Sequence, residues 1–287
     1  MHPLTQLLIG SAAALAVYPF VEARWFRLNR LRVPVHRPMP DVTVLHISDT
    51  HMSARDHRLR RFLRALNDTI DSPDLVVATG DLVEGDEGIE LLVATFGELF
   101  PRAARYYVLG SHDYYNARFQ SYGKYFATRG RHAIRAPVAD TERLEAGLHS
   151  AGWRSVANTD ATIEVNEITV RIGGVDDPYL NRHTTGHIAR GGDDALAIGL
   201  VHAPDVVSEW LLAGFDLVLA GHTHAGQVRI PGVGALVTNS SLPAALGGGL
   251  HRIGSGWLHV SPGLGTGRFA PIRFACRPEA TLLTLTP

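Results

Sequence analysis

Five short apolar stretches in this chain each run directly into a cluster of aspartate, glycine or histidine. The stretches are rich in valine, isoleucine and leucine, which predicts buried strands. In layered α/β folds, binding and catalytic sites assemble where such strands end. The polar clusters that follow the five stretches are Asp49-Thr50-His51, Gly80-Asp81, Gly110-Ser111-His112-Asp113, His202 and Gly221-His222-Thr223-His224.

Periodicity in the rest of the chain supports a layered α/β fold. Residues 58–70 and 88–100 have helical spacing, and helices between apolar strands indicate βαβ crossovers. Residues 160–177 alternate instead, with a hairpin turn predicted at Asn166 and Glu167. We therefore expect two sheets packed face to face, with helices outside, in one continuous domain.

The N-terminus differs from the rest because residues 4–21 form an almost uncharged apolar run. At about 1.5 Å per residue, this run is just long enough to cross a hydrocarbon core of ~30 Å. No lysine or arginine precedes it, whereas arginines follow it at positions 24, 27, 30 and 32. This pattern predicts a single membrane anchor over residues 1–23, a basic linker over 24–40 and a catalytic domain on the cytoplasmic side of the cell membrane.

Two other interpretations of the N-terminus stay open. Ala14-Leu15-Ala16 resembles a signal-peptide cleavage site, in which case the protein is exported. Alternatively, the segment is a helix packed on the domain, and Thr5, Gln6 and Ser11 weaken the membrane interpretation. We favour the anchor.

The chemistry of the strand-end clusters favours metal binding. Gly80-Asp81 alone is a common turn sequence, and a lone His202 is more often a hydrogen-bonded core residue. In contrast, His222 and His224 are two residues apart in an extended segment, so both rings point to one face. Together, five histidines and three aspartates at strand ends suit Zn, Mn or Fe. Two such ions, with a carboxylate between them, are the usual arrangement for hydrolysing phosphate esters.

The order Asp-x-His, Gly-Asp, Gly-Asn-His-Asp, His and Gly-His-x-His is that of the calcineurin-like metallophosphoesterases, which this chain resembles over residues 41–287. The resemblance implies a four-layer α/β/β/α sandwich and two divalent metal ions. It also implies that His112 protonates the leaving group or steadies the phosphate, with Asp113 orienting it. The implied metal ligands are Asp49, His51 and His224 for the first ion, Asp81 as the bridge, and His202 and His222 for the second.

Ser111 departs from the family pattern, which has asparagine at this position. In the family, the asparagine carbonyl is a ligand of the second metal. Serine is shorter by one heavy atom, and its neutral hydroxyl is a weak ligand. Ser111 stays in the predicted second metal site, either as a weak ligand or with a water between its hydroxyl and the ion. We expect the second ion to be held more weakly and the first site to be nearly unaffected.

The flanks are similar to a membrane-associated subgroup of YkuE- and YaeI-like phosphodiesterases. The similarity lies in the apolar N-terminus followed by residues 22–26, and in the tail GLGTGRFAPIRFACRPEATLLTL. Some relatives cleave the pyrophosphate of a UDP-linked diacylglucosamine. The resemblance therefore implies a phosphodiester or pyrophosphate substrate at the membrane, lipid-linked or a nucleotide sugar.

Three further features have both a catalytic and an ordinary interpretation. Asp176 and Asp177 precede a proline and look like turn residues, but they also follow a strand and could border the site. Glu84 is close in sequence to Asp81, and a surface role is as plausible as a role in the site. Residues 119–137 are basic and are predicted to form an exposed loop over the site.

Hydrolysis competes with other classes of function. A catalytically weakened relative that binds metal and a partner is one alternative, but such a protein has no need of a general acid like His112. A protein phosphatase is another alternative. A nuclease is disfavoured, and no nucleic-acid partner is expected, because the net charge is -1 and the N-terminus is apolar.

Overall fold

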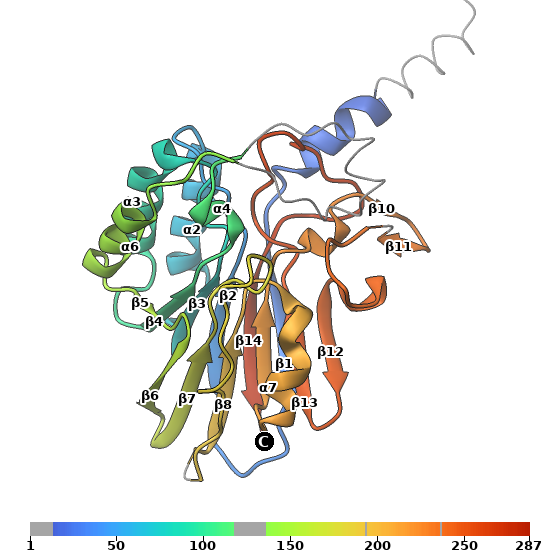
Figure 1. Ribbon diagram of the computed structural model, residues 1–287. Coiled ribbons are helices and arrows are strands. Elements are labelled where there is room, and N and C mark those ends of the chain that lie inside the picture. Colours follow the sequence, from blue (N-terminus) through green and yellow to red (C-terminus); the bar gives the residue numbers. More distant parts are fainter. Residues whose placement is uncertain (1–13, 118–135, 193, 236) are drawn as a thin grey trace, which may run out of the picture.

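Two six-stranded sheets form the centre of the molecule in the computed structural model, which describes residues 14–117, 136–192, 194–235 and 237–287 (Figure 1). The first sheet has the strand order β1-β14-β2-β3-β4-β5. Its strands are β1 (Arg27–Pro34), β2 (Val42–Ile47), β3 (Leu75–Thr79), β4 (Ala104–Val108), β5 (Arg154–Ser155) and β14 (Glu279–Thr286). The second sheet has the order β12-β13-β9-β8-β7-β6. Its strands are β6 (Thr159–Val165), β7 (Ile168–Gly174), β8 (Leu196–Leu200), β9 (Leu217–Ala220), β12 (Gly249–Ile253) and β13 (Gly256–Val260).

Both sheets are mixed, with a parallel centre. In the first sheet, β2 to β5 are parallel, and β14 runs antiparallel to β2. In the second, β7, β8, β9 and β13 are parallel, and β6 and β12 are antiparallel edge strands. The turn between β6 and β7 falls at Asn166 and Glu167, as predicted, and both residues have positive φ. Parallel strands covered on both faces need apolar side chains on both faces, which explains the continuous apolar runs.

Helices cover the outer face of each sheet, so the predicted four-layer α/β/β/α sandwich is confirmed. The first sheet carries α2 (His57–Thr69), α3 (Ile89–Glu98) and α6 (Thr141–Ser150), and the second carries α7 (Val207–Leu212). Alternate residues of one strand serve different layers, because Leu45 packs with the helices while Val44 packs between the sheets. Helix α2 buries Leu59, Leu63 and Leu66, which share one face of the predicted helix.

Short elements connect the layers at the end of the molecule where the parallel strands terminate. They are α4 (Ser111–Tyr114), the two-stranded hairpin β10 (Arg229–Ile230) and β11 (Gly234–Ala235), and the 3-10 turns η1 (Asp86–Gly88), η2 (Pro204–Val206), η3 (His224–Gly226) and η4 (Ala244–Leu246). The basic loop expected over residues 119–137 falls mostly on residues 118–135, which lie outside the described residues.

The basic stretch after the N-terminal segment is part of the fold and not a linker. Its central residues form β1, which pairs in parallel with β14 along its whole length, from Arg27 with Glu279 to Pro34 with Thr286. Residues 14–22 are helical, and the apolar run also includes residues 4–13, which lie outside the described part of the chain. Among the residues that are described, no helix combines the length and the apolar character needed to cross a bilayer.

Candidate metal centre

The five polar clusters meet at one edge of the two sheets. Strands β2, β3 and β4 are parallel neighbours in the first sheet, and β8 and β9 are parallel neighbours in the second. Parallel strands bring their carboxyl ends to the same edge, so the residues that follow them converge there. The side chains brought together in this way include the six strongest predicted ligands, Asp49, His51, Asp81, His202, His222 and His224.

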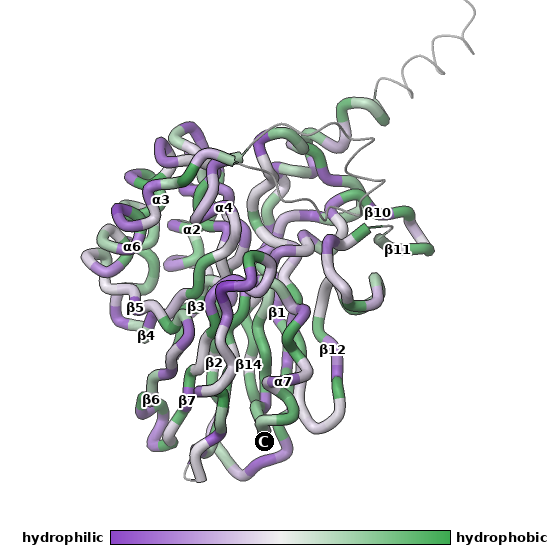
Figure 2. The backbone as a smooth tube through the Cα atoms, viewed as in Figure 1, coloured by the Kyte–Doolittle hydropathy of each residue, from purple (hydrophilic) through white to green (hydrophobic). Residues whose placement is uncertain are grey.

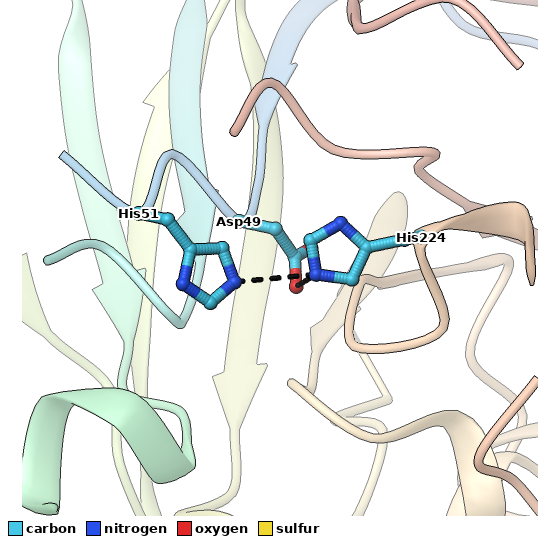
Figure 3. Close-up of side chains that lie close together, drawn as sticks. All are labelled: Asp49, His51 and His224. Carbon is cyan, nitrogen blue, oxygen red and sulfur yellow. Dashed lines mark hydrogen bonds and ion pairs between the residues drawn. The ribbon is translucent and has the colours of Figure 1, made fainter. Parts of the chain in front are cut away.

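Asp49, His51 and His224 form the first group of possible ligands, with one ligand atom of each within 4.8 Å of the others (Figure 3). The Nε2 atoms of His51 and His224 lie 3.2 Å apart, and His224 Nε2 lies 3.6 Å from Asp49 Oδ1. Ring nitrogens and a carboxylate oxygen that converge away from solvent are a donor set that suits Zn, Mn or Fe.

Asp81, His202 and His222 form the second group, and Asp81 lies between the two groups. Its Oδ2 atom is 3.4 Å from His202 Nε2 and 3.7 Å from His51 Nε2. This close approach requires a glycine nearby, because a Cβ on Gly110 would collide with the Asp81 carboxylate and the His202 ring. A carboxylate that faces ligands of both groups is placed where a residue bridging two ions would be.

The backbone is strained at most of these positions. Asp49, His51, Asp81, His222 and His224 all have φ between 40° and 68°. Residues other than glycine adopt this left-handed region only rarely, because the Cβ atom approaches the backbone carbonyl. Such strain persists where the surrounding structure holds it in place, and it concentrates at functional sites. Five left-handed residues in one cluster therefore mark this edge as a site under functional constraint.

Hydrogen bonds on the far side of the rings leave one nitrogen of each free to face the site. His51 Nδ1 lies 2.6 Å from a carboxylate oxygen of buried Glu84, and His202 Nδ1 lies 2.8 Å from the carbonyl oxygen of Thr79. Since neither oxygen can donate, both rings donate from Nδ1, and Nε2 is the atom that faces the site. Metal-binding histidines are usually oriented in this way.

Electrostatics of the buried cluster favour positive charge at its centre. Burial opposes protonation of His202, yet the carboxylates of Asp81 and Asp49 outweigh it and raise the pKa of His202 well above its usual range. Burial lowers the pKa of His222 to about 4, helped by the charge on His202, so His222 is neutral at pH 7. Burial likewise holds the pKa of His224 well below its usual range. Neutral imidazole is the form that binds a metal ion.

His112 lies beside the ligand groups but faces outward. Its backbone N–H donates to Asp81 Oδ1 at 2.8 Å, and its ring centroid is 4.7 Å from that of His51. Its side chain is 31% exposed, so a substrate can reach it. Burial would lower the pKa of His112, but the carboxylates of Asp81 and Glu84 raise it to about 9. An accessible imidazole next to the ligand groups is suited to donate a proton to a leaving group.

Asp113 was predicted to orient His112, but the carboxylate that pairs with the His112 ring is that of Glu84. The Asp113 carboxylate is fully buried and accepts the backbone N–H groups of Gly110, Leu82 and Val83, so it fixes the loop that carries His112. Glu84 Oε2 lies 3.3 Å from His112 Nδ1 and also bonds His51. The sequence signal for Glu84 was its position three residues after Asp81, but this spacing alone does not distinguish a surface residue.

Ser111 is the first residue of α4, directly before His112. Its position, next to a residue whose backbone bonds Asp81, places it beside the second ligand group. Weaker binding of the second ion, through the serine hydroxyl or through a water, stays a prediction.

The segment after β7 lies against one side of the second ligand group. The sequence had left open whether Asp176 and Asp177 border the site or form a turn. The Tyr179 ring lies 4.9 Å from the His222 ring, and Tyr114 donates a hydrogen bond to Asp176 at 2.8 Å. Asp177 is fully buried. Burial raises the pKa of Asp177 to about 7, with His202 lowering it and Asp81 raising it further. Asp176 and Asp177 therefore belong to the wall of the site and not to a solvated turn.

The chain belongs to the calcineurin-like phosphoesterase family, whose model matches residues 42–226. It is 28% identical to the metallophosphoesterase YkuE of Bacillus subtilis, over 84% of this chain and 78% of that protein. It is 26% identical to the phosphodiesterase YaeI of Escherichia coli, over 98% of this chain and 96% of that protein. It is also 31% identical to a bovine transmembrane protein with a metallophosphoesterase domain, over 90% of this chain and 56% of the bovine one.

The protein is thus a metal-dependent phosphoesterase, and its donor set fits a pair of divalent ions. Two groups of three possible ligands converge, and His51, Asp81 and His112 form a further possible group that overlaps both. Bound ions supply charge stabilisation for the phosphoryl oxygens and make water nucleophilic at neutral pH. The chain orients two of the ligand rings, His51 through Glu84 and His202 through Thr79, and the His112 side chain lies partly exposed beside them.

Proposed function

We propose that this protein is a dinuclear phosphodiesterase that hydrolyses a phosphodiester or pyrophosphate at a membrane surface. The observation that supports two ions is the position of Asp81, which faces ligands of both groups through one oxygen atom. A resident pair of Mn, Zn or Fe ions suits these nitrogen and oxygen donors. The accessible His112 supports hydrolysis over simple metal binding, because a binding protein needs no proton donor.

The membrane setting is proposed from the N-terminal segment. Its described part, residues 14–22, is helical and exposes Leu15, Val17, Phe20 and Val21 to solvent. Arginines follow it directly, which favours a catalytic domain on the cytoplasmic side. A relative named as a transmembrane protein and another named as a phosphodiesterase are consistent with this proposal. We infer a lipid-linked or nucleotide-sugar substrate, with UDP-2,3-diacylglucosamine as the first compound to test.

The test combines metal analysis with a substrate screen. The full chain is loaded with Mn, Zn or Fe and assayed on bis-p-nitrophenyl phosphate, UDP-2,3-diacylglucosamine, a UDP-sugar without acyl chains, and single-stranded DNA. We expect two ions per chain, turnover of the first two compounds and loss of turnover in Asp81→Asn. Fewer than one ion per chain in Mn-saturated protein, with no turnover of any diester, would refute the two-metal proposal. Turnover of DNA alone would refute the lipid-linked substrate.

A further inference from the structure

Exposed apolar side chains gather at the end of the molecule that carries the metal centre. Fourteen large hydrophobic side chains are exposed in the described part of the chain, and nine of them lie in two segments. These segments are residues 14–25 and the hairpin with its flanking residues, 228–235. Because the exposure is concentrated and not scattered, it indicates a contact surface. Figure 2 shows hydrophobic stretches on both segments.

The hairpin is short and almost uncharged. Residues 228–235 read VRIPGVGA, and Val228, Ile230 and Val233 are 46%, 45% and 72% exposed. Gly232 and Gly234 have positive φ, so the tip makes a tight turn between its two short strands. The hairpin therefore presents isoleucine, proline and valine at its tip, with Arg229 as its single charged residue.

Residues 273–276 fasten this hairpin to the end of the N-terminal helix. The backbone of Phe274 exchanges hydrogen bonds with Gln227 and Arg229, while its ring packs edge-on against Tyr18 at 5.7 Å. The carboxylate of Glu22 accepts the backbone N–H groups of Ala275 and Cys276. The two exposed segments are thus held by one short piece of chain, and Figure 1 shows both at the same end of the molecule.

Positive charge lies beside the apolar surface. A pocket of about 310 Å³ between the helix end and the hairpin is lined in part by Arg27, Arg229 and Arg277, with Glu22 and Glu279 as its acidic residues. Glu22 accepts hydrogen bonds from two backbone N–H groups, and Glu279 forms an ion pair with Arg27. Arg277 donates to the uncharged backbone carbonyls of residues 25 and 26, and the three arginines of the pocket exceed its two glutamates by one positive charge. Apolar side chains next to arginines match the acyl and headgroup layers of an anionic bilayer.

We propose that the β10–β11 hairpin inserts its tip, residues 230–233, into the headgroup layer of an anionic membrane, next to the N-terminal segment. This inference rests on the proposed membrane setting and adds a second, independent lipid contact. Its consequence for the reaction follows from the chain order. His224, a predicted metal ligand, lies five residues before β10 begins, so a hairpin in the bilayer surface holds the metal centre beside the headgroups of lipid-linked substrates.

The experiment uses the full chain reconstituted into vesicles of phosphatidylcholine and phosphatidylglycerol. An environment-sensitive fluorophore is attached at Val233→Cys, and at Leu212→Cys as the matched control. Leu212 is 88% exposed on α7, which lies away from the hairpin and the N-terminal helix (Figure 1). The unsubstituted chain is treated with the same fluorophore, so that any signal from buried Cys276 can be subtracted. We expect lipid-borne quenchers to reduce fluorescence at position 233 at least about twofold more than at position 212, because only the hairpin tip reaches the headgroup layer.

One of the outcomes separates the hairpin contact from the membrane setting. If the chain is in the vesicles and the probe at 233 is quenched no more than the probe at 212, the hairpin contact is refuted and the membrane setting survives. If the chain does not associate with the vesicles at all, both are refuted. Selective quenching at 233 supports both, and its loss in vesicles without phosphatidylglycerol supports the role of the arginines.

Discussion

His51 Nδ1 lies 2.6 Å from Glu84 Oε2, and the same carboxylate oxygen lies 3.3 Å from His112 Nδ1. Glu84 is buried, and this one carboxylate bonds a predicted metal ligand and also lies against the ring of the predicted proton donor. Burial would raise the pKa of Glu84, but His51 and His112 hold it well below its usual range. His51 and His112 therefore share the Glu84 carboxylate, whereas the Asp113 carboxylate accepts backbone N–H groups.

Glu84→Gln should weaken binding of the first ion by about 10–100-fold, because a neutral amide orients the His51 ring less strongly than a carboxylate. Calorimetric titration of metal-free protein with Mn measures the affinity. Glu87→Gln is the matched control, since Glu87 is exposed and pairs with Arg268 at the surface. Equal affinities in both variants would contradict the orienting role.

Ser111→Asn should strengthen binding of the second ion by about tenfold, equivalent to about 1.4 kcal/mol. The longer side chain brings a carbonyl oxygen to the place where serine offers only a short hydroxyl. Mn titration followed by electron paramagnetic resonance resolves the two steps, and the first should stay unchanged. Ser150→Asn, on the exposed end of α6, is the control. If the affinity for the second ion does not change, Ser111 is not what weakens the second site.

His112→Ala should lower kcat on bis-p-nitrophenyl phosphate by roughly 10²–10⁴-fold, the usual contribution of a positioned proton donor. The metal content should stay the same, because His112 is not among the six predicted ligands. His57→Ala, at the exposed start of α2, serves as the control. Unchanged turnover in a fully metal-loaded His112→Ala protein would exclude His112 as the proton donor.

His259 should make the metal-free protein less stable as the pH falls. It is fully buried between the sheets, with its Nδ1 2.9 Å from His46 Nδ1 and its Nε2 without a hydrogen-bond partner among the described residues. Burial lowers its pKa to about 3, helped by His251. The folded chain therefore keeps it neutral, while the unfolded chain takes up a proton below about pH 6.5. The contribution of neutral His259 to the free energy of unfolding is fully present above that pH and is lost as the pH falls toward 3.

The expected loss from this one histidine between pH 7 and pH 5 is about 2 kcal/mol, from about 1.4 kcal/mol per pH unit below 6.5. Urea unfolding of the metal-free chain at both pH values measures it. His259→Asn cannot take up a proton, so its stability should vary less with pH by that amount. His149→Asn, exposed on α6, should keep the full dependence. An unchanged pH dependence in His259→Asn would exclude this origin.

Much of the fold was predictable because its determinants are local. The apolar period of α2, the continuous apolar runs of β3 and β8, and the turn at Asn166 depend on nearest neighbours along the chain. The N-terminal basic stretch was not predictable in this way, because β1 is a strand only through its pairing with β14, about 250 residues later. Such a long-range edge pairing leaves little trace in a short, charged segment.

The candidate site also has features that the sequence predicts and features that depend on long-range contacts. The sequence by itself determined the ligand types and their order, because a metal demands nitrogen and oxygen donors and parallel strands place them at one edge. Only the tertiary structure decided which carboxylate lies against the His112 ring. Asp113 is adjacent to His112 in the sequence, whereas Glu84 is close to it only in space. Their roles follow from partners on other segments: His51 for Glu84, and the backbone of Leu82 and Val83 for Asp113.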